Sequence, residues 1–348
     1  MKKFEISTKN PYDIIIGNDI LRNTGLYLSE RLKPCKACVI TDSTVNSIYS
    51  QVLLTSLMEF GFQTSKVVFP SGEHSKTLST YTNIMEALAE EGITRSDIII
   101  ALGGGVVGDM TGFIASTYMR GIRYIQIPTT YLAAVDSSVG GKTGINLLSG
   151  KNLAGSFWQP HLVVTDYKTF DSLSPNKLKD GIAEAVKNAV VAEGSLINHI
   201  VNNDYEHVIE RCVSIKKSVV EADELDTGLR QLLNFGHTIG HGIEKLSSYS
   251  VSHGQSVAQG MIVESRAAFK MGLTSEDISK ELTEILLGAG FDLNVPYSAD
   301  DLHHYALMDK KISGNEITMI IPEAIGKCKL QKIPITNLKQ FIQLGLNK

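Results

Sequence analysis

Four side chains with donor or metal-binding chemistry recur at regular intervals in one stretch of the chain. They are Arg230, Asn234, His237 and His241. In a continuous helix, offsets of four, seven and eleven residues place side chains on one face, so we expect a helix over 228–246 that presents all four together. Two imidazoles one turn apart can bind one metal ion, as in HExxH helices, although the glutamate of that motif is absent here.

Two residues elsewhere in the chain could complete a metal site. Glu184 lies three positions before Lys187 in a helical pattern over 177–192, and His253 begins another over 253–271. One carboxylate, two imidazoles and an open position form a ligand set found at catalytic zinc. Structural histidines with ordinary hydrogen bonds are the alternative. Five other histidines lack such a setting, and we expect ordinary surface or core roles for them: His161, His199, His207, His303 and His304.

A glycine-rich turn follows a short apolar run at 98–102. The run is mostly β-branched and predicts a buried parallel strand. Gly103, Gly104 and Gly105 come next, before a helical pattern. Glycines at a strand-to-helix turn let backbone N–H groups approach a phosphate, and a dinucleotide pyrophosphate is the usual occupant. The spacing is GGGxxGD rather than GxGxxG, and a tight turn without a ligand is the alternative.

Six cationic side chains gather in the same segments. A bound phosphate or carboxylate would explain Arg and Lys at such positions, whereas solvated surface charge is the alternative for any one of them taken singly. The six are Arg120, Lys142, Lys151, Lys187, Lys216 and Arg230.

The predicted secondary structure around these residues changes near residue 172. Before it, short apolar strands alternate with helices, which predicts a doubly wound parallel sheet with ligands at the carboxyl ends of its strands. Strands are expected at 37–41, 64–69, 98–102, 124–127 and 162–165, with antiparallel strands within 4–17 and helices at 45–60 and 76–91.

After residue 172, helical patterns dominate. The sequence therefore predicts an α/β domain at 1–172 and a mostly helical domain at 173–348, with a cleft between them. Helices are expected at 177–192, 195–202, 205–224, 228–246, 253–271, 276–289, 299–309 and 336–345, with one short β-like segment at 316–322.

Composition indicates a globular protein and argues against nucleic-acid-binding and membrane-spanning proteins. A chain of 348 residues with 43% hydrophobic residues fits a two-domain globular protein. The net charge of −4 argues against nucleic-acid binding, and no run of about 20 apolar residues predicts a membrane span. No signal peptide is expected from the first residues, and four scattered cysteines favour buried thiols in a reducing cytosol, so we expect a cytoplasmic protein.

Taken together, these residues resemble the 3-dehydroquinate synthase family of sugar-phosphate cyclases. The resemblance runs in register from about Thr41 to about Gly326. Its most specific motifs span 103–109 (GGGVVGD), 118–121 (YMRG), 126–130 (QIPTT), 135–144 (VDSSVGGKTG), 150–152 (GKN), 183–187 (AEAVK), 234–241 (NFGHTIGH), 253–254 (HG) and 309–311 (DKK).

This resemblance implies an α/β NAD-binding domain with a doubly wound parallel sheet, an all-α metal-binding domain, and a homodimer. It also implies an enzyme, a phosphorus–oxygen lyase that converts 3-deoxy-D-arabino-heptulosonate 7-phosphate to 3-dehydroquinate and phosphate in the shikimate pathway. The reaction would proceed by transient oxidation by NAD, β-elimination of phosphate, re-reduction and intramolecular aldol closure. Its partner is a small phosphorylated sugar acid, with no nucleic acid and no membrane.

The family motifs assign roles to residues of this sequence. A divalent metal, zinc or cobalt, would be held by Glu184, His237 and His253. NAD would be held by Asp42, Thr44, Glu73, Lys76, Gly104, Gly105, Val106, Asp109, Thr129, Thr130, Lys142 and Lys151. Substrate-binding and catalytic roles would fall to His241, Lys142, Lys187, Lys216, Arg230, Asn234, Asn152, Arg120, Asp136 and Asp226, together with one lysine of the pair Lys310 and Lys311.

Three positions depart from the family pattern. Gln255 stands where Glu is common, Asp226 is shorter than the usual Glu, and Trp158 replaces Tyr or His. Two alternative functions share the main motifs. One is another sugar-phosphate cyclase, such as 2-deoxy-scyllo-inosose synthase, and the other is a metal-dependent polyol dehydrogenase of the glycerol dehydrogenase type.

Overall fold

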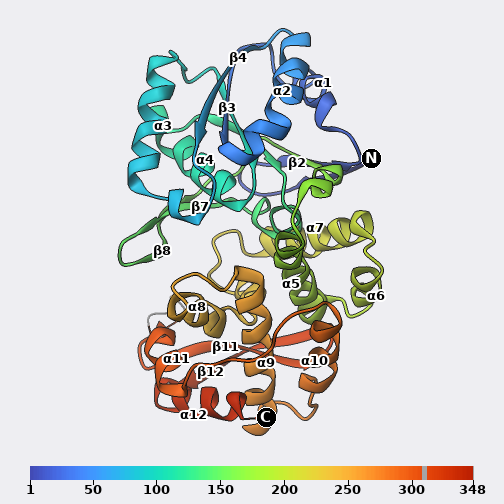
Figure 1. The fold of residues 1–348 in the computed structure, drawn as a ribbon, viewed down its shortest axis with the longest axis vertical. Helices are drawn as coiled ribbons and strands as arrows, with labels where there is room; N and C mark the ends of the chain where they lie inside the picture. The colour runs from blue at the N-terminus through green and yellow to red at the C-terminus, as the bar shows by residue number, and fades with distance from the viewer. Residues whose placement is uncertain (308–311, 348) are drawn as a thin grey trace. The chain divides into compact units, whose positions relative to one another are not determined.

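The computed structural model describes residues 1–307 and 312–347 (Figure 1). The chain divides into two compact units, Met1–Leu173 and Ser174–Lys348, which are described separately. Within the described ranges, no helix combines the length and the apolar character that crossing a bilayer requires.

The first unit is built on a seven-stranded sheet with the order β1-β2-β9-β6-β5-β3-β4. Every neighbouring pair is parallel except β1 and β2. The predicted doubly wound parallel sheet is thereby confirmed. The strands are β1 (Lys2–Ile6), β2 (Tyr12–Gly17), β3 (Lys36–Asp42), β4 (Gln63–Phe69), β5 (Ile98–Gly103), β6 (Arg123–Pro128) and β9 (Leu162–Asp166).

Helices cover both faces of this sheet, so its inner strand β5 is buried on both sides. Ile98 and Ile100 of β5 pack in one apolar cluster with Leu53 of α2, whereas Ile99 packs in the opposite cluster with Met110 of α4. A strand in this position has no solvated face, which is why its sequence is a continuous apolar run. The helices of this unit are α1 (Thr24–Ser29), α2 (Ser43–Glu59), α3 (Leu78–Glu90) and α4 (Gly105–Thr117), with short 3-10 turns η1 (Leu21–Asn23), η2 (Glu73–Ser75), η3 (Tyr118–Arg120) and η5 (Tyr167–Ser172).

A separate hairpin forms between β6 and β9, where no strand is expected from the sequence. β7 (Lys142–Leu147) pairs antiparallel with β8 (Gly150–Phe157). Gly144 faces Gly155, and a Cβ on Gly155 would collide with the carbonyl of Thr143. Ile145 is buried in the same apolar cluster as the α4 side chains. The glycines therefore allow close strand pairing here, and one apolar anchor fixes the hairpin on α4.

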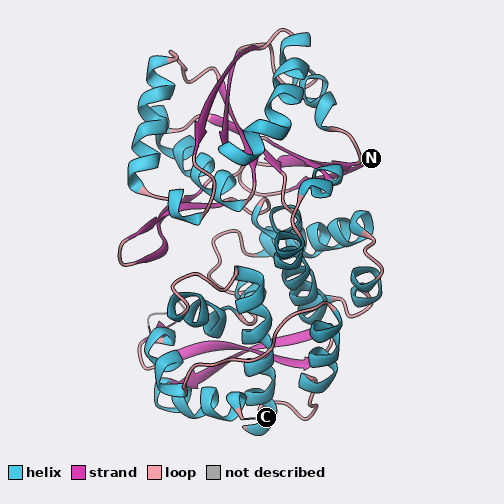
Figure 2. Ribbon diagram, in the orientation of Figure 1, coloured by secondary structure: helices cyan, strands magenta, loops and turns pink. Residues whose placement is uncertain are grey.

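The second unit is mainly helical, as the sequence predicts, but it contains a small sheet and is therefore not the all-α domain that the family resemblance implied. β10 (Ile312–Ser313), β11 (Glu316–Ala324) and β12 (Lys327–Pro334) form a three-stranded antiparallel sheet, drawn in magenta in Figure 2. β11 matches the expected β-like segment, and its alternate residues Ile317, Met319 and Ile321 are buried against the helices. β12 was missed because lysines interrupt its apolar pattern.

The helices of the second unit occur near the predicted positions, with one exception. They are α5 (Pro175–Ala192), α6 (Leu196–Val201), α7 (Tyr205–Ala222), α8 (His237–Leu246), α9 (His253–Lys270), α10 (Ser279–Gly288), α11 (Ala299–Ala306) and α12 (Ile335–Leu346), with the 3-10 helix η6 (Leu229–Asn234).

The exception is the single helix expected over 228–246. It is broken between η6 and α8, because Gly236 adopts a left-handed φ of 79° that a continuing helix does not allow. Arg230 and Asn234 therefore do not share one helical face with His237 and His241, and that part of the sequence argument is wrong.

Close helix packing holds the start of α8 in place. A Cβ on Gly260 of α9 would collide with the carbonyl of Gly236, and a Cβ on Gly240 of α8 would press on the backbone of Ser256. The backbones of α8 and α9 therefore lie nearly in contact at the end that carries His237 and His253.

We predict that Gly260→Ala destabilises the protein by about 1–3 kcal/mol or more, because the added methyl group forces two backbones apart. Chemical denaturation of the full chain measures this change. Gly288→Ala in α10 is the matched control, since nothing lies within 4 Å of its Cβ position. That variant should be neutral or gain up to ~1 kcal/mol, and equal destabilisation of both variants would contradict the packing argument.

Candidate metal centre and cofactor site

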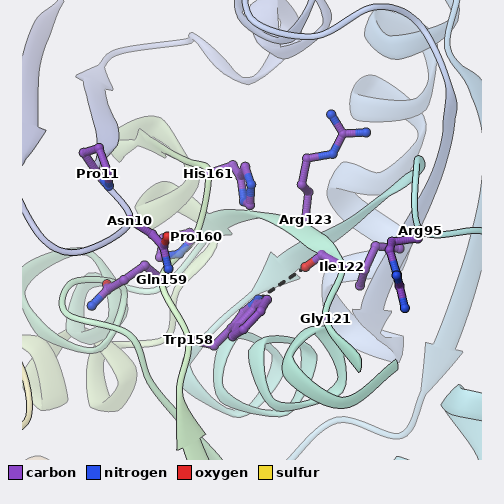
Figure 3. A pocket seen from close by; sticks show the side chains of 10 residues that line it. All are labelled: Asn10, Pro11, Arg95, Gly121, Ile122, Arg123, Trp158, Gln159, Pro160 and His161. Carbon is purple, nitrogen blue, oxygen red and sulfur yellow. Dashed lines mark hydrogen bonds between the residues drawn. The ribbon is translucent and has the colours of Figure 1, made fainter. Parts of the chain in front are cut away.

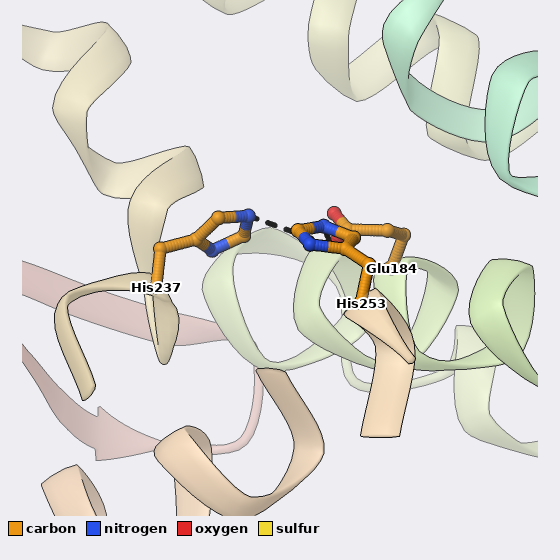
Figure 4. A group of neighbouring side chains, drawn as sticks. All are labelled: Glu184, His237 and His253. Atoms are coloured by element: carbon orange, nitrogen blue, oxygen red, sulfur yellow. Dashed lines mark ion pairs between the residues drawn. The ribbon is translucent and has the colours of Figure 1, made fainter. Parts of the chain in front are cut away.

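Three side chains from three helices converge in the second unit (Figure 4). Glu184 lies within α5, His237 is the first residue of α8, and His253 is the first residue of α9. Nε2 of His237 lies 3.5 Å from Oε1 of Glu184, and Nε2 of His253 lies 3.3 Å from the same oxygen. One potential ligand atom from each residue lies within 4.8 Å of the others.

Neighbouring acceptors orient both imidazoles. Nδ1 of His237 lies 3.1 Å from the carbonyl oxygen of Phe235, and Nδ1 of His253 lies 3.3 Å from Oε1 of Glu244. A ring whose Nδ1 donates to such an acceptor presents a free lone pair on Nε2, which is the arrangement usual for metal-binding histidines. Both Nε2 atoms are the ones that face Glu184.

Buried carboxylates also hold the two helix starts that carry these histidines. The N–H of Gly236 donates to Oε2 of Glu264 at 2.9 Å, immediately before α8. The N–H of Gly254 donates to Oδ1 of Asp180 at 3.0 Å, in the first turn of α9. Each bond satisfies a backbone donor that a helix leaves unpaired at its N-terminus.

The charge of Glu184 is buried and needs compensation. Glu184 is fully buried and forms an ion pair with Lys187, one turn later on α5. Burial alone would raise the pKa of Glu184, but Lys187 and the two imidazoles hold that pKa well below its usual range. Oε1 makes no hydrogen bond of good geometry with any residue of the described ranges, although it faces both imidazoles. A buried carboxylate oxygen with two imidazole nitrogens fits a divalent metal such as zinc.

The two imidazoles differ in their affinity for protons. Burial lowers the pKa of His237 to about 3, so this ring is neutral at physiological pH. Burial would also lower the pKa of His253, but Glu184 and Glu244 raise it to about 10. A metal ion that binds His253 must therefore displace the proton that this ring otherwise holds.

His241 lies beside this triad. Its ring centroid is 5.4 Å from that of His237 and 6.3 Å from that of His253, and its side chain is exposed. His241, Glu244 and His253 form a second, overlapping group of potential ligands. Sequence reasoning missed Glu244, although it follows His237 by seven positions and so lies on the same face of α8.

Buried cations lie on the neighbouring elements. Lys216 on α7 and Arg230 in η6 are buried, and both elements pack against α5, which carries Lys187. Nη1 of Arg230 donates to the carbonyl of Glu224 at 2.6 Å, and its backbone N–H donates to Oδ2 of Asp223 at 3.0 Å. The first bond fixes the guanidinium and the second fixes the backbone of Arg230, which is only 1% exposed.

Two of the remaining predicted residues of this unit lie in η6 and in the loop before it. Asn234 is the last residue of η6 and is partly buried, and Asp226 lies in the preceding loop with a left-handed φ of 59°.

The side-chain amide of Gln255 bonds to both backbone groups of Asp292. Its Nε2 donates to the carbonyl, and its Oε1 accepts from the N–H at 3.2 Å. A glutamate would lack the donor for the first bond. Lys310 and Lys311 lie outside the described residues.

The first unit gathers candidate cofactor residues at the carboxyl edge of its sheet. Asp42 ends β3 and caps α2, because its Oδ1 accepts from the N–H of Thr44 and Val45 at 2.9 and 3.0 Å. Gly104 is the N-cap of α4, which Gly105 and Val106 begin. A Cβ on Gly104 would collide with Thr130, whose neighbour Thr129 donates its N–H to the carbonyl of Gly103 at 3.0 Å. The glycine turn and the β6 turn therefore lie against each other.

A second polar cluster joins α4 to the hairpin. Nζ of Lys76 lies 2.6 Å from Oδ2 of Asp109 and 2.6 Å from Oδ1 of Asn152. Asn146 extends this cluster to Glu73. Its Nδ2 donates to Oε1 of Glu73 at 2.8 Å, and its Oδ1 accepts from the N–H of Asn152 at 3.0 Å. The structure thus places three predicted cofactor residues beside one predicted substrate residue.

The other predicted residues of this unit are more scattered. Lys142 begins β7 and is exposed, Lys151 follows in β8, and Asp136 lies in the π-helical turn η4 (Ala133–Ser137). Arg120 is exposed in a loop where it and Met119 both have left-handed φ angles, 64° and 50°.

A pocket of about 380 Å³ lies next to the loop of Arg120 (Figure 3). The guanidinium of Arg95 donates to the carbonyl of Met119 from Nε and Nη2, at 3.2 and 2.7 Å, and Nε1 of Trp158 donates to the carbonyl of Ile122 at 3.3 Å. These bonds support a strained backbone. None of the predicted site residues lines this pocket, which is lined by Asn10, Pro11, Arg95, Gly121, Ile122, Arg123, Trp158, Gln159, Pro160 and His161.

Two family models match the chain. One, described as the N-terminal part of 3-dehydroquinate synthase, matches residues 66–180, and one described as the C-terminal part matches residues 181–312. A 3-dehydroquinate synthase of Enterococcus faecalis is 42% identical over 343 residues, 95% of each chain. One of Streptococcus thermophilus is 40% identical over 354 residues, 98% of this chain and 99% of the other.

Solved structures share the same fold. A 2-deoxy-scyllo-inosose synthase complexed with carbaglucose-6-phosphate, NAD⁺ and Co²⁺ has a TM-score of 0.89 and 28% identity, covering 98% of this chain and 99% of its own. Glycerol dehydrogenase of Schizosaccharomyces pombe resembles this chain in fold, with a TM-score of 0.68 and 17% identity, covering 96% of this chain and 88% of its own. With matches across residues 66–312 and relatives 40–42% identical over nearly its whole length, the chain belongs to the 3-dehydroquinate synthase family.

Proposed function

We propose that the chain converts 3-deoxy-D-arabino-heptulosonate 7-phosphate to 3-dehydroquinate and phosphate, with NAD and a divalent metal ion, zinc or cobalt. The observation that carries the proposal is the convergence of the buried Glu184 and His237 with the half-buried His253 in a chain of this family. The bound NAD⁺ and Co²⁺ named for the 2-deoxy-scyllo-inosose synthase support both cofactors.

The metal would be held by Glu184, His237 and His253. When bound, a metal ion polarises a substrate oxygen and lowers the pKa of an alcohol, while NAD accepts and returns a hydride. The protein orients the two rings through Phe235 and Glu244, so little reorganisation is needed when an ion binds.

The cationic side chains would hold the anionic groups of the substrate. Lys187, Lys216 and Arg230 are buried, so their attraction for a carboxylate or phosphate is screened less than on the surface. Arg230 offers a planar fork that fits either anion, and Asn234, Asn152 and Lys142 would add hydrogen bonds. Arg120, in its exposed loop, would reach the substrate phosphate, from the partner subunit of a homodimer.

Proton transfer and substrate orientation would fall to His241, which is exposed beside the triad. Asp136 would lie near the nicotinamide, and Asp226 would assist as a base only if its short side chain reaches the substrate.

NAD would lie at the carboxyl edge of the sheet in the first unit. The backbone N–H groups at the start of α4 are suited to its pyrophosphate, because Gly104 and Gly105 leave the approach open. The other residues proposed to contact it are Asp42, Thr44, Glu73, Lys76, Val106, Asp109, Thr129, Thr130, Lys142 and Lys151. We also propose a cytoplasmic location and a partner set without nucleic acid or membrane.

The two alternative functions differ in measurable products. The chain is 40–42% identical to 3-dehydroquinate synthases but 28% identical to the 2-deoxy-scyllo-inosose synthase, which favours the first substrate. A polyol dehydrogenase would accumulate NADH, whereas a cyclase returns the hydride to an oxidised intermediate before its product is released.

We predict that the purified chain releases phosphate from the heptulosonate phosphate with no lasting rise in NADH absorbance at 340 nm, because the redox steps cancel. Phosphate release should stop after treatment with a chelator and resume when zinc or cobalt is added. Release from glucose 6-phosphate instead would indicate the inosose synthase activity. Growth of NADH absorbance with a polyol would indicate the dehydrogenase.

We predict that His237→Ala lowers metal affinity by at least ~100-fold and abolishes phosphate release, because outer-shell changes alone cost roughly 10–100-fold. Metal content after dialysis and phosphate release measure the two effects. His304→Ala, an exposed histidine on α11, is the matched control and should match wild type. Normal metal content in His237→Ala would remove this residue from the ligand set.

We predict that Arg230→Ala raises KM by roughly 10–100-fold, since one hydrogen bond to a charged group contributes about 1.5–3 kcal/mol. Steady-state phosphate release measures this change, with circular dichroism as a check that the buried site still folds. Arg230→Lys keeps the positive charge but loses the planar guanidinium, so its KM should lie between those of wild type and Arg230→Ala. Unchanged KM and kcat in Arg230→Ala would exclude Arg230 from the substrate site.

A further inference from the structure

A second group of metal-binding side chains lies outside the candidate active site. His199, Asp204 and His207 each offer one ligand atom, and these atoms lie within 4.8 Å of one another. The sequence favours ordinary roles for both histidines, because no helical spacing joins them: His199 lies near the end of α6 and His207 in the first turn of α7. The turn between the helices brings them together.

The backbone of this turn fixes two of the three residues. Asn203 has a left-handed φ of 55° and follows the end of α6. Its N–H donates to the carbonyl of Ile200 at 3.1 Å, and the N–H of Asp204 donates to the carbonyl of His199 at 3.0 Å. This pair of bonds is the Schellman arrangement of a helix C-terminus. His199 and Asp204 are therefore held in a set relation before any ion binds.

The carboxylate of Asp204 joins the two helices. Its Oδ1 accepts from the backbone N–H of His207 at 3.3 Å and so caps α7, while Oδ2 lies 2.9 Å from Nδ1 of His199. The hydrogen bond with His199, together with the capping bond, holds the pKa of Asp204 below its usual range. The carboxylate is thus ionised at neutral pH and remains next to both rings.

The two imidazoles stack closely. Their centroids lie 3.8 Å apart with 21° between the ring planes, closer than the 4.5–7 Å that aromatic pairs generally prefer. This stacking brings ring nitrogens of His199 and His207 close together beside one carboxylate. The side chains of His199 and Asp204 are 39% and 44% exposed, so an ion can enter from solvent and small side-chain rotations can bring the ligand atoms to bonding distance.

We propose that His199, Asp204 and His207 form a peripheral binding site for a divalent transition-metal ion of the zinc type. Two imidazoles and one carboxylate match the ligands that zinc accepts, and water would complete the coordination. Imidazole ligands disfavour calcium and magnesium, which take oxygen donors. An ion at this position would tie the end of α6 to the start of α7. The site does not depend on the function proposed above.

The test counts zinc ions bound to the full-length chain after stripping with a chelator and dialysis against zinc. His207→Ala and His199→Ala should each bind one ion fewer than wild type, and His304→Ala should bind the same number as wild type. His237→Ala should also lose one ion, from the other site, and the double variant His237→Ala/His207→Ala should lose both. If only the active-site assignment is wrong, His207→Ala should still bind one zinc ion fewer than wild type.

Asp204→Asn tests whether a loss of bound zinc results from a missing ligand or from misfolding. Asparagine also caps helices well, so α7 should keep its N-cap while the cation loses a charged ligand. We expect this variant to keep the helix content of wild type by circular dichroism and to bind the peripheral zinc at least ~10-fold more weakly. Phosphate release should be unchanged in all three peripheral variants when the other site is loaded. Zinc binding equal to wild type in His207→Ala and in Asp204→Asn would overturn the proposal.

Discussion

The burial of one carboxylate constrains the whole second unit. Glu184 is fully buried, and an ionised group in that position is tolerated only when opposite charge and donors surround it. Lys187 on the same helix supplies one compensating charge, and the starts of α8 and α9 supply two imidazoles. The buried carboxylates of Glu264 and Asp180 hold those two helix starts in place through backbone N–H bonds. A metal ion would complete this balance, since it brings the positive charge that three converging ligands favour.

Close backbone packing makes this convergence possible. Gly236, the N-cap of α8, has a left-handed conformation, and Gly260 lets α9 lie against it. Larger side chains at these positions would move His237 relative to His253. The stability of the helix pair and the geometry of the metal ligands therefore depend on the same contacts, so a packing mutation far from solvent is expected to change metal affinity as well.

The first unit meets a different requirement, which is to present backbone donors at the edge of a buried sheet. β5 is covered on both faces, and the glycine turn at its carboxyl end leads into α4. The cluster of Lys76, Asp109 and Asn152 then fixes the β7–β8 hairpin beside that helix. The rigid sheet thus positions the polar side chains through short connections, as in other doubly wound folds.

The parallel sheet, most helices and the family could be predicted from the sequence, because apolar periodicity, glycine turns and spaced motifs are local properties of the chain. The break at Gly236, the β7–β8 hairpin and the β12 strand could not be predicted, since each depends on which backbone packs alongside. The tertiary structure also decided the role of Glu244 and the meeting of His199 with His207. Distances between side chains on different helices follow from packing and turn geometry, which residue spacing along the chain does not encode.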